Sequence, residues 1–84
     1  MVIIFRKSFY KDYEKLTKKI QDKFWNRLEI FKEDKNHKTL HNHSVDKTFT
    51  NCKSINVTGD YRAIFKKNGD IVVFVNISTH SELY

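Results

Sequence analysis

The chain has 84 residues, enough for one hydrophobic core and one domain over residues 1–84, but not for a second domain. Hydrophobic residues make up 39% of it and aromatic residues 14%, which argues against disorder, and no stretch approaches the roughly 18 apolar residues of a membrane span. Sixteen Lys and Arg residues against ten Asp and Glu residues give a net charge of +6, which favours a polyanionic partner: nucleic acid, the ribosome or an acidic protein.

The N-terminal part of the sequence predicts a strand followed by a helical hairpin. Met1–Phe5 contains three β-branched residues and is typical of a strand. Between Ser8 and Lys32, apolar residues recur every three or four positions, the spacing of one helical face. These residues are Phe9, Tyr13, Leu16, Ile20, Phe24, Leu28 and Phe31. One helix of this length is unusual in so small a domain, so we expect a break near residues 16–18, with Thr17 as the N-cap of the second helix.

The middle of the chain carries weaker signals. Glu33–Asn42 is polar and predicts a loop. His43–Val57 has strand character, with Val45 and Phe49 as weak signals and a clearer alternation near its end. The single cysteine, Cys52, excludes an internal disulfide framework and fits a reducing cytosol; we expect it to be a small apolar side chain in a strand.

The last part of the chain predicts a β-hairpin. Asn68-Gly69 lies between two alternating runs and favours a type I′ turn, in which both central residues have positive φ. That turn would place Lys67 opposite Asp70, Phe65 opposite Val72 and Ala63 opposite Phe74. Residues 71–77 are almost all apolar, so this strand is expected to be central and covered on both faces.

The predicted order is therefore β-α-α-β-β-β. It describes an α+β fold in which a small, antiparallel-rich sheet carries a helical hairpin on one face. The first strand is expected to join the edge of the sheet after the crossover. The N-terminus has no secretory pattern, so a cytoplasmic location is expected.

Polar side chains able to carry a proton or bind a phosphate lie at the margins of the last strands. They are Asn56, Asp60, Arg62 and His80, with the aromatic residues Tyr61 and Tyr84 beside them. Metal-independent RNA cleavage requires a base for the 2′-OH, an acid for the 5′-oxygen, and donors for the charge on the phosphorane. Histidine suits both proton transfers because its unperturbed pKa is about 6.5. The pattern favours a small RNA-cleaving domain in which His80 is the best candidate for an acid–base role, with an exposed loop histidine as the alternative.

His43 is the candidate for a second catalytic histidine, whereas His37 and His41 fit solvated loop positions. The string at residues 41–43 spells HNH, but the nucleases of that name separate these residues within a metal-binding ββα motif. No further zinc ligands accompany the two histidines of this string. We therefore expect neither a metal nor another cofactor.

Several roles stay open at this point. Asp60 could orient a histidine, act as the base, or only shape the turn at Gly59. Arg62 offers a planar donor fork to a phosphate, or forms a structural ion pair. Tyr84 could stack on a base or be a frayed terminal residue. Tyr61 and Arg62 are adjacent, so in a regular strand they point to opposite faces, and both serve one site only if Tyr61 belongs to the turn.

The predicted element order, the segment GDYRAIF before an apolar strand, and the ending THSELY together resemble the RelE/ParE superfamily of bacterial toxin–antitoxin modules. The resemblance covers essentially the whole chain, including the opening KSFYKDYEKL. Within the superfamily the chain is most similar to the YafQ-type endoribonucleases. Such toxins cleave messenger RNA in the ribosomal A site and are silenced by a cognate antitoxin.

The resemblance assigns the site residue by residue. The YafQ-type pattern falls on His43, Asn56, Asp60, Tyr61, His80 and Tyr84, and the spacings fit without a gap. Asn56 stands where a histidine is expected, and Tyr61 where tryptophan is usual. Asn56 cannot carry a proton as a histidine can, so which residues act as the general acid and the general base stays open. Arg62 matches the strand arginine of RelE-type relatives.

Basic residues supply the remaining candidates for phosphate contact. Lys53, Lys66 and Lys67 lie around the predicted sheet, and further lysines crowd the predicted helices. In ribosome-bound relatives such surfaces meet ribosomal RNA, and an RNA affinity of this kind weakens steeply with salt. Solubility or an AT-rich genome explains the same lysines equally well.

The resemblance thus implies a cytoplasmic toxin that cleaves translated messenger RNA, with the ribosome and a separate acidic antitoxin as partners. Two alternatives remain open. A ParE-like inhibitor of DNA gyrase shares the fold without a cleaving site, and a decayed toxin would only bind RNA or an antitoxin.

Overall fold

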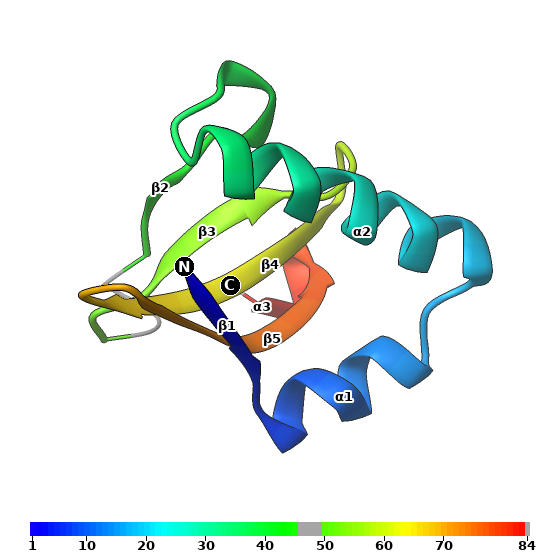
Figure 1. The fold of residues 1–84 in the computed structure, drawn as a ribbon. Coiled ribbons are helices and arrows are strands. Elements are labelled where there is room, and N and C mark those ends of the chain that lie inside the picture. The colour runs from blue at the N-terminus through cyan, green and yellow to red at the C-terminus, as the bar shows by residue number, and fades with distance from the viewer. Residues whose placement is uncertain (46–49, 84) are drawn as a thin grey trace.

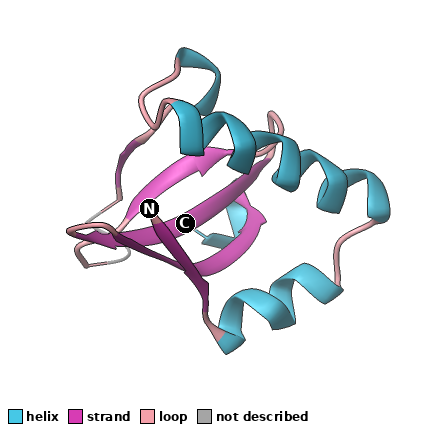
Figure 2. Ribbon diagram, viewed as in Figure 1, coloured by secondary structure: helices cyan, strands magenta, loops and turns pink. Residues whose placement is uncertain are grey.

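The fold is a five-stranded sheet with two longer helices on one face, in a computed structural model that describes residues 1–45 and 50–83 (Figures 1 and 2). The elements are β1 (Val2–Phe5), α1 (Lys7–Glu14), α2 (Lys18–Glu33), a 3₁₀ turn η1 (Lys38–Leu40), β2 (His43–Ser44), β3 (Lys53–Asn56), β4 (Tyr61–Asn68), β5 (Ile71–Thr79) and α3 (His80–Leu83). The strand order is β1-β5-β4-β3-β2, with β1 parallel to β5 and the other neighbours antiparallel. The predicted α+β class and the edge position of the first strand are confirmed.

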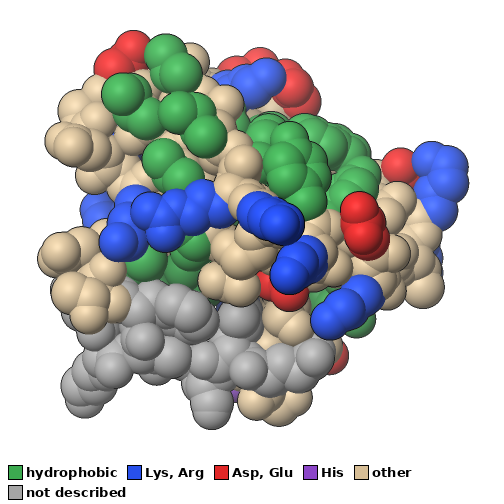
Figure 3. All heavy atoms as spheres, turned by 90° about the horizontal axis from the view of Figure 1, so that it is seen from below, with side chains coloured by type: hydrophobic (Ala, Val, Ile, Leu, Met, Phe, Trp, Pro, Cys, Tyr) green, Lys and Arg blue, Asp and Glu red, His purple; other side chains and the backbone are tan. Residues whose placement is uncertain are grey.

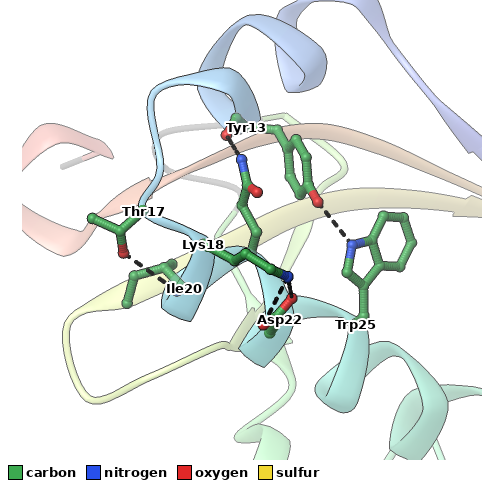
Figure 4. A network of polar contacts seen from close by, with 7 residues as sticks. Tyr13, Thr17, Lys18, Ile20, Asp22 and Trp25 are labelled. Carbon is green, nitrogen blue, oxygen red and sulfur yellow. Dashed lines mark hydrogen bonds and ion pairs between the residues drawn. The ribbon is translucent and has the colours of Figure 1, made fainter.

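The helical hairpin breaks where the sequence predicts. Helix α2 begins after Thr17, whose Oγ1 accepts a hydrogen bond from the Ile20 amide at 3.4 Å (Figure 4). Tyr13, in α1, ties the two helices together: its carbonyl accepts from Gln21 Nε2 at 3.0 Å, and its hydroxyl accepts from Trp25 Nε1 at 2.8 Å. These bonds set the angle at which α2 crosses the sheet.

The main core lies between the helices and the sheet. Phe74, in the middle of β5, is fully buried and lies at the centre of this core. Its ring centroid lies 5.4 to 6.1 Å from those of Phe5, Phe9, Phe24, Phe31 and Phe65. A smaller cluster on the opposite face joins Val45, Cys52, Ile64 and Val75. Strand β5 therefore contributes to both clusters. It is an inner strand of the sheet, but the prediction that both of its faces are covered holds only in part, since Ile71 is exposed and Val73 and Asn76 are half-buried.

The outer edge of β5 is completed by two different elements. β1 pairs with residues 71–74, and α1 continues along the edge beyond that point. Ser8 Oγ donates to the carbonyl of Val75, and Asp12 Oδ2 accepts from the amide of Ile77 at 3.1 Å and from Asn76 Nδ2 at 3.0 Å. Side chains of α1 thus satisfy β5 backbone groups that would otherwise need another strand.

The predicted turn and register of the hairpin are wrong. Asn68 pairs with Ile71, so the two central residues are Gly69 and Asp70 rather than Asn68 and Gly69. Among these three only Gly69 has a positive φ, of 60°, which is the requirement at the first central position of a type II′ turn. The register also shifts between Ile64 and Phe65, because β5 carries one extra residue there.

That correction changes every predicted pair. Lys67 lies opposite Val72, Phe65 opposite Phe74 and Ala63 opposite Ile77. Glu33–Asn42 is not entirely a loop either, since α2 includes Glu33 and the η1 turn buries Leu40 completely. Within His43–Val57 the structure forms two short strands, β2 and β3, and Phe49 lies outside the described residues.

Truncating the central ring should destabilise the fold strongly. We expect Phe74→Ala to lower the free energy of unfolding by about 3–5 kcal/mol, because it removes a buried ring and leaves a cavity among five others. Ile71→Ala, at a position that is 44% exposed in the same strand, should cost less than about 1 kcal/mol. Urea unfolding followed by circular dichroism measures both, and similar losses for the two variants would contradict the central place of Phe74.

The two glycines should respond differently to a methyl group. No heavy atom lies within 4 Å of a Cβ built at Gly59 or Gly69, but only Gly69 has a left-handed φ, of +60°. Gly69→Ala should therefore cost about 1–2 kcal/mol of backbone strain. Gly59→Ala should be neutral or stabilise by at most about 1 kcal/mol. Thermal unfolding of both variants tests this, and equal effects would exclude a conformational origin.

Candidate active site at the strand ends

Asp60 and His80 come together at one end of the sheet, although 20 positions separate them in the sequence. Asp60 ends the turn before β4, and His80 follows the last residue of β5 and begins α3. The His80 backbone amide donates to the Asp60 carbonyl at 2.9 Å, which extends the β4–β5 ladder by one step. Both residues are exposed, so the carboxylate and the imidazole can reach a solvent-borne substrate.

A row of polar residues continues from this end across the sheet. Arg62 pairs with Asn56 on one side and with Ser78 on the other. Directly opposite residues of an antiparallel pair share a face, so these side chains follow one face of the sheet. His43 pairs with Ser54, which makes it the diagonal neighbour of Asn56, about 7–8 Å away on that same face.

The structure does not make His43 and His80 neighbours. His43 lies in β2 at the far edge, and β3 and β4 separate it from β5. With strands about 4.8 Å apart, the backbones of β2 and β5 are roughly 14 Å apart. The His43 ring is exposed and donates from Nδ1 to the carbonyl of His41 at 2.6 Å. Any joint action of the two imidazoles would need a substrate that spans the sheet.

Tyr61 and Arg62 point to opposite faces. Tyr61 belongs to β4, pairs with Thr79 and packs against the main core, so it is not part of the turn. The condition under which both residues could serve one site is not met. The guanidinium of Arg62 contacts the turn that precedes β4: its Nη1 donates to the carbonyls of Gly59 at 3.2 Å and Thr58 at 3.3 Å. Arg62 thus holds the β3–β4 turn, and it forms no ion pair with a described residue.

Thr58 fixes the same turn from inside. Its Oγ1 accepts from the amide of Asp60 at 3.3 Å and from the amide of Tyr61 at 3.1 Å. Thr58 and Arg62 together set where the Asp60 carboxylate leaves the backbone. Lys53 lies at the opposite end of β3, beside Phe65, and is not part of this cluster. Tyr84 lies outside the described residues, so its role stays a prediction.

A cleft beside this end was missed by the sequence analysis. It has a volume of about 440 Å³ and lies between α2 and the β3–β4 turn. Its α2 wall carries Lys19, Lys23 and Arg27, and its other wall includes Asn56 and Thr58. The steps of four between the three basic residues were visible in the sequence, but only the fold shows that this side of α2 faces the turn.

The described residues contain neither a cluster of metal ligands nor a membrane-spanning helix. Within residues 1–45 and 50–83, no three His, Cys, Asp or Glu side chains gather as the ligands of a metal ion would. No helix in the described part of the chain is long and apolar enough to cross a membrane.

The family of the chain follows from its match to a family model. Residues 3–84 match the family described as "ParE toxin of type II toxin-antitoxin system, parDE". The chain therefore belongs to this family and is a toxin of the RelE/ParE superfamily. The comparison with curated protein sequences gives no match.

Solved structures share the fold at low sequence identity. YafQ from E. coli strain BL21(DE3) has a TM-score of 0.81 and 16% identity, over 98% of this chain and 96% of that one. YafQ in the E. coli DinJ–YafQ complex gives 0.77 and 18%, over 98% and 96%. A chain of the RelB–RelE antitoxin–toxin complex from Methanococcus jannaschii gives 0.75 and 22%, over 96% and 94%. These likenesses show the same fold.

Removing the Thr58 hydroxyl should loosen the turn that carries Asp60. Thr58→Val keeps the shape of the side chain but leaves two amides without their acceptor. We expect hydrogen exchange at the amides of Asp60 and Tyr61 to accelerate roughly fivefold, the equivalent of about 1 kcal/mol. Thr58→Ser, which keeps the hydroxyl, is the control. Unchanged exchange in the valine variant would mean that Arg62 alone holds the turn.

Proposed function

We propose that this toxin is a ribosome-dependent endoribonuclease that cleaves translated messenger RNA by metal-independent acid–base chemistry. The observation that carries the proposal is the meeting of Asp60 and His80 at one exposed end of the sheet, through the 2.9 Å backbone hydrogen bond. A carboxylate and an imidazole in adjacent positions are a suitable pair for moving protons in phosphodiester cleavage.

His80 is the general acid in this mechanism and protonates the 5′-oxygen that leaves. Asp60 either orients that imidazole or takes the proton from the 2′-OH. His43 and Asn56 lie on the same face as Arg62 and extend the site towards β2, where they would hold the RNA strand on either side of the cut. Tyr84, which the resemblance to YafQ-type toxins assigns to the site, would stack on a base or contact a phosphate. Tyr61 packs against the core on the other face and Lys53 lies at the far end of β3, so neither is given a role at the cut.

The partners follow from the same proposal. The ribosome presents the messenger RNA, and a cognate antitoxin silences the toxin. An antitoxin partner is supported by the fold shared with the RelB–RelE antitoxin–toxin complex and the DinJ–YafQ complex. The net charge of +6 suits both the ribosome and an acidic antitoxin. The protein acts in the cytoplasm, where translated messages are found.

Replacing His80 tests the mechanism. We expect His80→Ala to lower messenger RNA cleavage by about 10²- to 10⁴-fold, the usual contribution of a general acid, and to relieve growth arrest on induction. The backbone bond to Asp60 remains, because it uses the His80 amide. Primer extension on a translated message after brief induction measures the cleavage. His37→Asn is the control, since it keeps a side-chain acceptor for the Thr39 amide. Cleavage by His80→Ala at the parental rate would exclude the assigned role.

A second function is favoured by one observation. The matching family model is that of ParE toxins, and Asn56 stands where a YafQ-type site has a histidine. A non-enzymatic inhibitor of DNA gyrase fits both facts. Induction would then cause DNA damage signalling while messages stay intact, an outcome opposite to the one expected from the nuclease.

A further inference from the structure

The cleft beside α2 has the lining of an anion site. Lys19, Lys23 and Arg27 occupy positions i, i+4 and i+8 of the helix, so their backbone positions are roughly 6 Å apart along its axis. Ile20 and Val57 supply apolar surface between the walls. None of the lining residues is acidic.

The positive charge of this row is not balanced locally. The ion pairs found among the described residues join Lys18 to Asp22, Lys32 to Glu29, and the N-terminus to Asp70, so the row has no carboxylate partner among them. On the face seen from the side of α1, Figure 3 shows both Lys and Arg side chains and Asp and Glu side chains. The lining of the cleft instead carries three cations and no carboxylate.

Arg27, on the α2 wall of the cleft, has a buried Nε without a hydrogen-bond partner among the described residues. An unpaired buried donor costs about 1–3 kcal/mol. A bound anion that drew the Arg27 fork into the cleft would remove that cost.

We propose that this cleft holds the phosphodiester backbone of single-stranded RNA next to the scissile linkage. The inference rests on the proposed nuclease function and deepens it. Thr58 and Gly59 line the cleft and immediately precede Asp60. RNA bound along the three basic residues would therefore continue directly to the end of the sheet where Asp60 and His80 lie. No Phe, Tyr or Trp lines the cleft, and His41 is the single lining residue with an aromatic ring. The cleft therefore contacts the RNA mainly through its phosphates, which carry no sequence information.

The experiment uses the full chain carrying His80→Ala and a short single-stranded 2′-O-methyl RNA, which cannot be cleaved. Nitrogen–proton correlation spectra should show a shift at the Arg27 Nε–H on titration. The variant Lys23→Gln/Arg27→Gln should bind about tenfold more weakly. The slope of log affinity against log salt should fall by roughly 1.4, or 0.7 for each lost phosphate contact.

The matched control is Lys7→Gln/Arg6→Gln, which removes the same two kinds of charge from exposed positions away from the cleft. Equal losses in the two double variants would show that only overall charge matters and would overturn the proposal. The proposal is also wrong if Lys23→Gln/Arg27→Gln binds the RNA as tightly as the parent protein but binds a polyglutamate peptide more weakly, while the control variant binds that peptide normally. An acidic protein would then be the occupant.

The nuclease assignment fails separately. If the wild-type protein leaves translated messages intact but the RNA still binds through the cleft, the catalytic proposal is wrong and the binding site stands. Spectra of both double variants with the dispersion of the parent protein verify that each is folded.

Discussion

The structure depends on β5, an inner strand whose side chains enter both core clusters. The backbone groups at the edges of a strand placed in this way need partners within the protein, because an unpaired buried group costs free energy. β4 completes one edge along its whole length. The other edge needs β1 for residues 71–74, and then Ser8 and Asp12 of α1. This requirement explains why the chain begins with a strand that turns directly into a helix lying beside β5.

The extra residue in β5 sets which side chains reach the end of the sheet that carries Asp60 and His80. From Phe65 to Asn68 the pairs follow one register, and that register continued without a bulge would set Arg62 opposite Ile77. A shift of one residue exchanges the faces of a strand. The bulge instead sets Ile77 opposite Ala63, within the main core, and Ser78 opposite Arg62, on the polar row. The pairing that brings His80 to Asp60 follows from the same shift.

Sequence reasoning succeeded where short-range physics decides. The helical spacing of Phe9 to Phe31, the cap at Thr17 and the apolar run of β5 each depend on neighbours along the chain. The hairpin register failed because Gly69 can serve at the first or the second central position of a two-residue turn, and a bulge has no signal in this sequence. The meeting of Asp60 with His80 could not be predicted from the sequence, because the expected register sets Asp60 opposite Ile77 and the observed one depends on the turn and the bulge. The place of Tyr61 on the helix-covered face depended on where β4 begins.

The short strand β2 shapes the other side of the site. It pairs with Lys53 and Ser54 only, so the part of β3 that carries Asn56 has no further strand beside it within the described residues. An open edge of this kind is available to a ligand or a partner chain. Here α2 and the turn at residues 57–60 stand beside it and form the cleft, with cations on one wall. Asn56 therefore belongs to the polar row through its pairing with Arg62 and also lies at the border of the cleft.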